Sequence, residues 1–313
     1  MKPELLMTGA MFKPTQAVLE GAYTVHKLWE APDRDAFLAS VADRITAVAT
    51  TGSKGIDDAT LAKLPKVKMI SHFGVGVDSV DVEAVKRRGI ALTNTPDVLT
   101  EDVADVAVVL MLSAIRRVPQ GDRYVREGKW LKGPMALTQS VQGKTVGIIG
   151  LGRIGKAIAK RCEAFNLKVA YQGRGKQPGV PYAYFADPLS LAKECDVVVV
   201  AAPGGEATRG LVSRAVLEAL GPEGTIVNIA RGSLIDEPAM IEALKSGKLG
   251  AAGLDVFDRE PKVPEELLAL DNVVVQPHVG SATHPTRTAM GQLVIDNLAA
   301  FFAGKPLKTP YSG

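Results

Sequence analysis

The sequence predicts an α/β protein made of two doubly wound, parallel-sheet domains. Short apolar runs ending in Gly, Asn or Pro alternate with segments of helical pattern, as in repeated βαβ units. Several runs are continuous Val and Ile stretches, such as "DVVVVAAP" and "NVVVQP", which suit strands buried on both faces of a parallel sheet. At 313 residues, the chain is long enough for two domains that each bury a core.

Two series of candidate strands follow one another along the chain. The first series consists of "PELLMTG", "YTVHKLW", "ITAVATTG", "VKMISHFG" and "IALTNTP". A long apolar segment at about 101–118 predicts a helix between the two series. The second series consists of "TVGIIGLG", "KVAYQGR", "DVVVVAAP", "GTIVNIARG", "AAGLDVF" and "NVVVQPHVG". A last helix is predicted at about 283–303, with Gly304 and Pro306 as stop signals.

These elements predict where one domain gives way to the other. We expect residues 99–282 to form the second domain, with the Gly-rich "GPMALTQSVQGKT" as a loop leading into its first strand. The final helix is expected to return to the first domain. That domain would therefore combine residues 1–98 with 283–313.

Composition excludes several classes of protein. The net charge of +3 is too small and too evenly spread for a nucleic-acid or membrane surface. No apolar run approaches a membrane span, and the N-terminus lacks the apolar core of a signal peptide. Cys162 and Cys195 are the only cysteines, so no disulfide framework and no metal site are predicted. We expect a cytoplasmic protein.

A glycine fingerprint opens the second domain. It follows an apolar strand, precedes a helix-forming segment, and reads Gly150, Leu151, Gly152, Arg153, Ile154, Gly155. Gly150 would make the tight turn, Gly152 would let the backbone approach a pyrophosphate, and Gly155 would let helix and strand pack closely. The pyrophosphate would bind at the helix N-terminus. Because strand, glycines, helix and a further strand occur in order, the pattern predicts a Rossmann-like dinucleotide-binding domain rather than a close helix–strand contact alone.

The tip of the next strand carries cations where an acid is usual. An Asp or Glu about 20 residues after the fingerprint normally binds the ribose 2′-hydroxyl of NAD. Here "YQGRGK" offers Arg174 and Lys176 and no acid. Charge-assisted hydrogen bonds contribute roughly 1.5–3 kcal/mol each, so two such contacts would favour NADPH by about ten- to several-hundredfold. The alternative is that both are solvated loop cations. The missing acid favours NADPH over NADH, which stays possible.

Three strand ends of the second domain present polar side chains suited to carbonyl reduction. Arg231 follows "TIVNIA", Glu260 lies in "GLDVFDREP", and His278 follows "NVVVQP". Ligands bind at the carboxyl ends of the strands in such sheets. An imidazolium supported by a carboxylate can protonate a forming alkoxide, and a guanidinium can bind a substrate carboxylate. From spacing alone, a structural Arg–Glu pair and a strand-capping histidine are equally compatible. His26 is interpreted as structural.

Four ordered motifs resemble the D-2-hydroxyacid dehydrogenase family. They are "GLGRIG", "NIARGSLIDEPAMIEAL", "GLDVFDREP" and "PHVGSATHPTR", and the similarity runs from about residue 65 to 300. "YQGR" and "PHVGSATH" are most similar to the glyoxylate/hydroxypyruvate reductases, which use NADPH. The resemblance implies two flavodoxin-like and Rossmann-like domains with an active-site cleft between them. It places the catalytic Arg, Glu and His on Arg231, Glu260 and His278.

The resemblance also implies binding residues. Substrate contacts are expected from the backbone amides of Val75 and Gly76, from Arg231, and from Ser281. Asp255 matches the residue that contacts the nicotinamide carboxamide. Three further positions would line the cofactor cleft, namely Pro203, Ile229 and Gly280. Members of the family are homodimers in which the segment around 101–135 crosses between subunits, so Trp130 is interpreted as interface packing. His284 is interpreted as structural.

We therefore expect NADPH-dependent reduction of small 2-oxo acids, such as glyoxylate and hydroxypyruvate, to D-2-hydroxy acids. One alternative is a reductase of bulkier 2-oxo acids such as phenylpyruvates. Phosphoglycerate, formate or phosphonate oxidation are further enzymatic alternatives. A non-catalytic dinucleotide sensor is the alternative from another class, because the fold also occurs in transcriptional corepressors. The complete set of Arg, Glu and His favours an enzyme.

Overall fold

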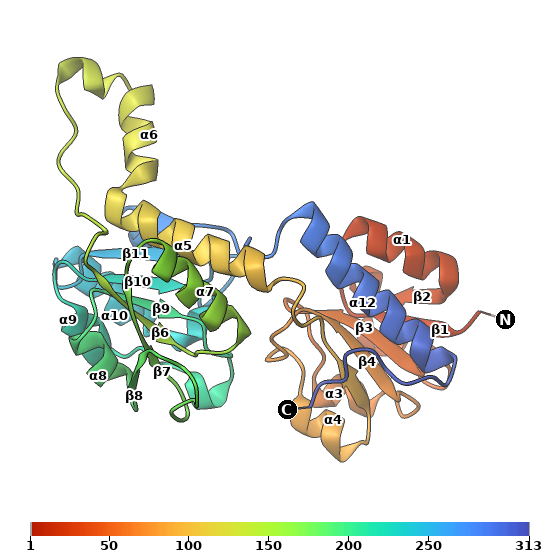
Figure 1. The fold of residues 1–313 in the computed structure, drawn as a ribbon. Helices are drawn as coiled ribbons and strands as arrows, with labels where there is room; N and C mark the ends of the chain where they lie inside the picture. Colours follow the sequence, from red (N-terminus) through yellow and green to blue (C-terminus); the bar gives the residue numbers. More distant parts are fainter. Residues whose placement is uncertain (1, 313) are drawn as a thin grey trace. The chain divides into compact units, whose positions relative to one another are not determined.

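The computed structural model describes residues 2–312, and they divide into two compact units (Figure 1). Thr100–Ser281 forms one unit without interruption. The other is built from two separate stretches of chain, one ending at Leu99 and one beginning at Ala282. Each unit has a single sheet in which every strand pair is parallel, so the predicted α/β class is confirmed.

The discontinuous unit has a five-stranded sheet in the order β2-β1-β3-β4-β5. This is the flavodoxin-like order, in which the order of strand addition reverses between β1 and β3 while all strands stay parallel. The central strands β1, β3 and β4 are almost wholly buried, as continuous apolar strands require. The strands are β1 Glu4–Met7, β2 Thr24–Lys27, β3 Ala47–Thr51, β4 Met69–Phe73 and β5 Ala91–Thr93.

Helices cover both faces of this sheet. The long α12 packs against β4 and against α1 on one face, while α3 and α4 lie side by side near β5. Buried Asn297 of α12 donates to the Thr309 hydroxyl (2.9 Å) and accepts from the Lys308 and Thr309 amides, which fastens the last segment to the helix. The helices are α1 Lys13–Ala22, α2 Arg34–Val41, α3 Asp58–Ala62, α4 Val82–Arg87 and α12 His284–Phe302.

The continuous unit has a seven-stranded sheet in the order β12-β11-β10-β9-β6-β7-β8. This is the Rossmann order extended by one strand, with the reversal between β6 and β9. A crevice for a ligand is expected at the carboxyl ends of the strands on either side of that reversal. The strands are β6 Thr145–Ile149, β7 Lys168–Gln172, β8 Ala183–Phe185, β9 Val197–Val200, β10 Thr225–Asn228, β11 Ala251–Leu254 and β12 Val273–Val275.

Helices pack on both faces of this sheet as well. One group contains α5, which contacts β10, β11 and α7 (Figure 1). The other contains α8, α9 and α10, which pack side by side. The helices are α5 Thr100–Arg116, α6 Val118–Arg126, α7 Arg153–Ala164, α8 Pro188–Lys193, α9 Arg214–Leu220, α10 Glu237–Lys245 and α11 Glu265–Leu268. No helix of residues 2–312 combines the length and apolarity needed to cross a bilayer.

The structure adds two features that the sequence pattern did not predict. The helix expected at about 101–118 ends at Arg116, because Arg117 adopts a left-handed conformation (φ 50°) and α6 then begins at Val118. Strand β8 is only three residues long, lies at the sheet edge and is partly exposed. So short a strand has no periodicity that a sequence pattern could reveal.

Candidate active site

The glycine fingerprint forms a turn between β6 and α7, and each glycine has a different steric reason. A Cβ on Gly150 (φ 94°) would lie 2.6 Å from the Ala202 amide nitrogen, just beyond β9. A Cβ on Gly155 would lie 2.2 Å from the Gly150 carbonyl oxygen. A Cβ on Gly152 would meet nothing within 4 Å. The turn is therefore packed on its protein side and open at Gly152, where α7 begins. This arrangement fits a dinucleotide pyrophosphate.

The loop after β7 presents two cationic side chains to solvent. Arg174 and Lys176 are exposed, and within residues 2–312 neither forms an ion pair. Both follow the strand that neighbours β6 in the sheet. Their charges are thus available to a ligand bound at the fingerprint turn.

That loop is anchored by residues whose role the sequence did not reveal. Tyr171 is fully buried, and its hydroxyl accepts a hydrogen bond from the Gln177 amide (2.7 Å). The Gln177 side chain donates to the Leu151 carbonyl (2.9 Å), inside the fingerprint turn. Tyr184 packs on Tyr171 with ring centroids 5.4 Å apart. The cation-bearing loop and the fingerprint turn are therefore directly connected.

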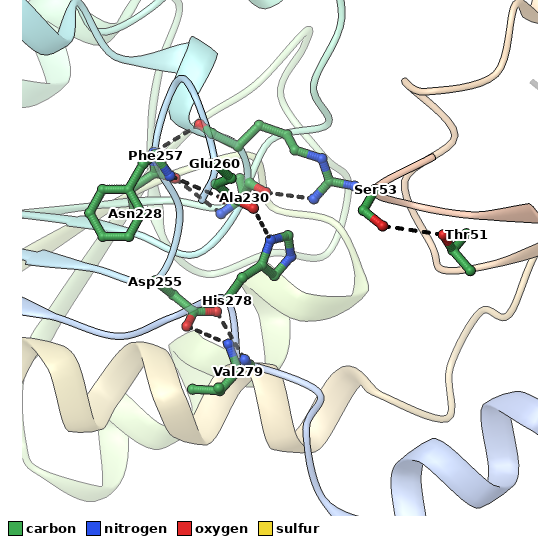
Figure 2. A network of polar contacts seen from close by, with 11 residues as sticks. Thr51, Ser53, Asn228, Ala230, Asp255, Phe257, Glu260, His278 and Val279 are labelled. Atoms are coloured by element: carbon green, nitrogen blue, oxygen red, sulfur yellow. Dashed lines mark hydrogen bonds and ion pairs between the residues drawn. The ribbon is translucent and has the colours of Figure 1, made fainter. Parts of the chain in front are cut away.

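Glu260 and His278 form a hydrogen-bonded pair (Figure 2). The His278 Nδ1 lies 2.7 Å from Glu260 Oε2, while Glu260 Oε1 accepts from the Phe257 amide (3.1 Å). Burial of the Glu260 carboxyl raises its pKa, but the hydrogen bond and charge of His278, with smaller contributions from the Phe257 amide and Arg231, leave that pKa below the usual 4.5. The carboxylate therefore stays ionised, and it orients the imidazole through Nδ1.

Arg231 follows β10 and lies close enough to Glu260 for its charge to lower the carboxyl pKa. Its Nη1 donates to the Ala230 carbonyl (2.6 Å), and Asn228 accepts from the Ala230 amide and donates to the Arg231 carbonyl. A Cβ on Gly232 would lie 1.9 Å from the Phe257 carbonyl carbon, so the loops after β10 and β11 are in close backbone contact. Arg231, Glu260 and His278 therefore come from adjacent strand ends of one sheet.

Buried Asp255 shapes the turn that carries His278 (Figure 2). Its two carboxylate oxygens accept from the Val279 amide (2.7 Å) and the Gly280 amide (2.9 Å), and its carbonyl accepts from the His278 amide. Burial raises the pKa of Asp255, although these amides act in the opposite direction. His278 adopts a left-handed conformation (φ 54°), which these contacts hold in place. The expected contact of Asp255 with a nicotinamide stays a prediction.

The remaining predicted positions in this unit lie at or beyond the same strand ends. Ile229 is buried directly after β10, and Gly280 is buried in the turn made by Asp255. Pro203 is exposed beyond β9, and its carbonyl accepts from the Thr208 hydroxyl (2.8 Å). Ser281 is partly exposed at the end of the unit. Their binding roles also stay predictions.

In the discontinuous unit, the Gly-rich loop after β4 is held by its carbonyl groups. The Gly74 carbonyl accepts from the Thr95 amide and the Val75 carbonyl from Asn94 Nδ2, both at 2.9 Å. The Gly76 carbonyl lies 2.8 Å from Nε2 of buried His72. Because a carbonyl oxygen only accepts hydrogen bonds, this nitrogen is the donor and carries a proton. No hydrogen bond among residues 2–312 has the amide of Val75 or Gly76 as its donor. This loop can present those amides to an anion.

His72 was not singled out by the sequence, because it lies inside an apolar strand and belongs to no motif. His26 forms a hydrogen bond with Glu4 (2.7 Å), and the His284 ring lies 6.5 Å from that of Phe12. Within residues 2–312, no three His, Cys, Asp or Glu side chains are grouped as metal ligands. At the strand ends, Arg231, Glu260 and His278 supply a guanidinium, a carboxylate and an imidazole.

Comparison with known proteins identifies the relatives of this chain. Residues 108–280 match the family model for the D-isomer specific 2-hydroxyacid dehydrogenase, NAD binding domain. The chain is 48% identical to glyoxylate/hydroxypyruvate reductase A from Arabidopsis thaliana, with 98% of each chain covered. It is 46% identical to hydroxyphenylpyruvate reductase from Plectranthus scutellarioides over the same share of both chains. These alignments extend well beyond residues 65–300, where the motifs were recognised.

Solved structures agree with these relatives. The 2-hydroxyacid dehydrogenase from Ketogulonicigenium vulgare is 46% identical and has a TM-score of 0.92. The match covers 99% of this chain and 98% of that one. The NADPH-dependent glyoxylate/hydroxypyruvate reductase from Sinorhizobium meliloti, solved with NADP and malonate, is 40% identical. Its TM-score is 0.94, with 100% of this chain and 97% of that one covered. The chain is an oxidoreductase that uses NAD(P), and it belongs to the D-isomer specific 2-hydroxyacid dehydrogenase family.

Proposed function

We propose that this protein reduces small 2-oxo acids, with glyoxylate and hydroxypyruvate as substrates, to D-2-hydroxy acids at the expense of NADPH. The observation that carries the proposal is the 2.7 Å pair of Glu260 and His278 beside Arg231 at the carboxyl ends of a Rossmann sheet. The fold alone does not require a histidine oriented by a carboxylate at this place, so the pair points to a catalytic role. Relatives named glyoxylate/hydroxypyruvate reductase support the choice of substrate.

The roles of the side chains follow from their chemistry. Arg231 binds the substrate carboxylate bidentately and polarises the neighbouring carbonyl. The amides of Val75 and Gly76 are proposed as further donors to that carboxylate, with Ser281 as a minor contact. The reduced nicotinamide supplies the hydride that reaches substrate C2.

Proton delivery falls to His278. Its Nδ1 faces Glu260, so Nε2 is the nitrogen left to donate. As the carbonyl carbon gains the hydride, the oxygen gains a proton from Nε2, and the Glu260 carboxylate stabilises the imidazolium before transfer. With His278 46% exposed and Glu260 34% exposed, solvent can restore the proton after each turnover.

The preference for NADPH is assigned to Arg174 and Lys176. Both are exposed next to the strand that neighbours the fingerprint, and no acid accompanies them in "QGRGK". Because they lie in solvent, we expect the discrimination to weaken as ionic strength rises. The relative from Sinorhizobium meliloti is described as NADPH-dependent, which supports the same choice.

Initial rates of glyoxylate and hydroxypyruvate reduction, each with NADPH and NADH, test the proposal. Fast NADPH-dependent turnover is expected, and His278→Ala should lose about 10²- to 10⁴-fold in kcat. His26→Asn serves as the control, because His26 pairs with Glu4 in the discontinuous unit and no catalytic role is proposed for it. Near-normal kcat in His278→Ala would contradict the assigned acid. Tight NADPH binding without turnover of any acid would favour a dinucleotide sensor instead.

A second candidate substrate class is the bulkier 2-oxo acids. The observation that favours it is the 46% identity to a hydroxyphenylpyruvate reductase, only slightly below the 48% to the glyoxylate/hydroxypyruvate reductase. Including hydroxyphenylpyruvate in the same assay separates the two classes. A higher kcat/KM for the aromatic acid than for hydroxypyruvate would select this second candidate.

We further propose that the active form is a homodimer. Helix α6 and the segment after it extend away from the sheet of their own unit (Figure 1). They expose large apolar side chains, including Trp130 (68%), Leu131 (94%) and Leu137 (99%). Several large apolar side chains exposed on one projecting segment are typical of an interface. Light scattering should give twice the chain mass, and Leu131→Ser with Leu137→Ser should shift the protein toward the monomer.

A further inference from the structure

We propose that Tyr171 and Gln177 are positioning residues for cofactor choice. They hold the loop of residues 173–177 so that Arg174 and Lys176 face the position of the 2′-phosphate. This inference rests on the proposed use of NADPH. We call the two contacts of Gln177, to the Tyr171 hydroxyl and to the Leu151 carbonyl, the Gln177 brace.

The loop needs such support because of its composition. Gly173 and Gly175 flank Arg174, and both have open space where a Cβ would lie. Glycine gives the backbone the widest conformational freedom, so ordering this loop on a ligand would cost entropy. The cations are exposed and unpaired within residues 2–312, so their own side chains do not fix the loop.

Tyr171 provides the fixed end of the brace. It is the last buried residue of β7, it pairs in register with Ile148 of β6, and its side chain is completely inaccessible to solvent. Its ring packs on Tyr184, whose hydroxyl in turn donates to the Gly173 carbonyl (3.4 Å). A hydroxyl buried in the sheet therefore receives the Gln177 amide, and the loop must turn back on the strand to make this contact.

Gln177 provides the connection to the dinucleotide turn. Its side chain donates to the Leu151 carbonyl, between Gly150 and Gly152. The pyrophosphate site is common to NADH and NADPH, whereas only NADPH carries the phosphate that Arg174 and Lys176 would bind. Linking the loop to that turn sets the distance from pyrophosphate to cations. Losing the brace should consequently weaken NADPH binding and leave NADH binding nearly unchanged.

The test separates the 2′-phosphate from the rest of the cofactor. Isothermal titration of 2′,5′-ADP and of 5′-AMP would be measured for the wild-type chain, Gln177→Met and Tyr171→Phe. Both substitutions keep the shape and remove the hydrogen-bonding group. We expect the preference for 2′,5′-ADP to fall by about three- to tenfold, the effect of one positioning hydrogen bond. The NADPH/NADH ratio of kcat/KM should fall in parallel.

Two matched substitutions control for side-chain chemistry elsewhere. Tyr182→Phe removes a hydroxyl that contacts Glu163 near the surface, and Gln292→Met removes an exposed helix contact to Asp296. Neither should change the preference. If Tyr171→Phe lowers the melting temperature strongly, Gln177→Met decides the matter, because Gln177 is only partly buried.

A double-mutant cycle completes the argument. When Arg174→Ala and Lys176→Ala are already present, Gln177→Met should not change the remaining preference, because no cation is left to position. If the wild-type chain prefers 2′,5′-ADP over 5′-AMP and both Gln177→Met and Tyr171→Phe leave that preference intact, only the proposed role of the brace is refuted. Equal binding of both fragments by the wild-type chain would overturn the proposed use of NADPH and the brace with it.

Discussion

The pairing of Glu260 with His278 predicts a particular outcome for Glu260→Gln. Both carboxylate oxygens of Glu260 accept hydrogen bonds, one from the Phe257 amide and one from His278 Nδ1. Glutamine has the same shape but only one acceptor oxygen. If that oxygen stays with Phe257, the side-chain amide presents a donor to Nδ1, and the carboxylate that orients and stabilises the donating imidazolium is lost.

The size of the effect follows from the lost charge-assisted bond. Such bonds contribute about 1.5–3 kcal/mol, and we take the lower end because both side chains are partly exposed. About 1.4 kcal/mol corresponds to a factor of ten. Proton transfer from His278, and with it kcat for hydroxypyruvate reduction near neutral pH, should therefore slow about tenfold.

The pH profile identifies the cause. The pKa of Glu260 is held below its usual 4.5, so the wild-type carboxylate is ionised throughout pH 6 to 8. The loss in Glu260→Gln should therefore be about the same across that range. Glu237→Gln is the matched control. Glu237 of α10 accepts a hydrogen bond from the Asp258 amide, in the loop that carries Glu260, and does not contact His278. Profiles of kcat against pH that superimpose for Glu260→Gln and the wild type would refute this reasoning.

Two other changes test local structure. Gly232→Ala places a methyl group 1.9 Å from the Phe257 carbonyl carbon, so the loops must separate by an ångström or more. We expect kcat/KM to fall about 10²-fold and the melting temperature to drop. Gly21→Ala, in helix α1 with open space for the methyl group, should leave kcat/KM unchanged and should not lower the melting temperature. Asp57→Ala removes the N-cap of α3 and should cost about 1 kcal/mol in urea unfolding at pH 7. Hydrogen bonds from Thr60 lower the pKa of Asp57, so this stabilisation is present above its usual 3.8 and should vanish as pH falls through the lower native value. A penalty that persists unchanged at pH 2 would contradict that assignment.

Much of the fold was predictable because burial on both faces leaves a direct trace in the sequence. Strands such as Val197–Val200 consist only of valine, and the helix Arg153–Ala164 begins directly after Gly152 of the fingerprint. The edge strand Ala183–Phe185 leaves no such trace, because partial exposure removes the need for continuous apolar residues. The break at Arg117 also escaped prediction, since a left-handed arginine depends on its surroundings rather than on its own preference.

The candidate site was predictable to the extent that its residues follow strands directly. Glu260 and His278 were proposed from their place after two strands, and the structure brings them within 2.7 Å. The contacts of His72 and Gln177 were not predictable. His72 meets the Gly76 carbonyl only because the loop folds back over the strand, and Gln177 reaches Leu151 across 26 positions of sequence. Such contacts are set by tertiary structure, and no spacing rule encodes them.

The division of one unit into two stretches of chain has a consequence for folding. Everything that the continuous unit needs lies between Thr100 and Ser281, so it can fold as soon as that stretch has been synthesised. The other unit must wait, because α12 and the segment that reaches the Asn94 carbonyl through Thr309 come last. Until then the surface of β4 that α12 covers stays open to water and to other chains. We expect a chain shortened before residue 282 to bind dinucleotide normally while its first 99 residues aggregate.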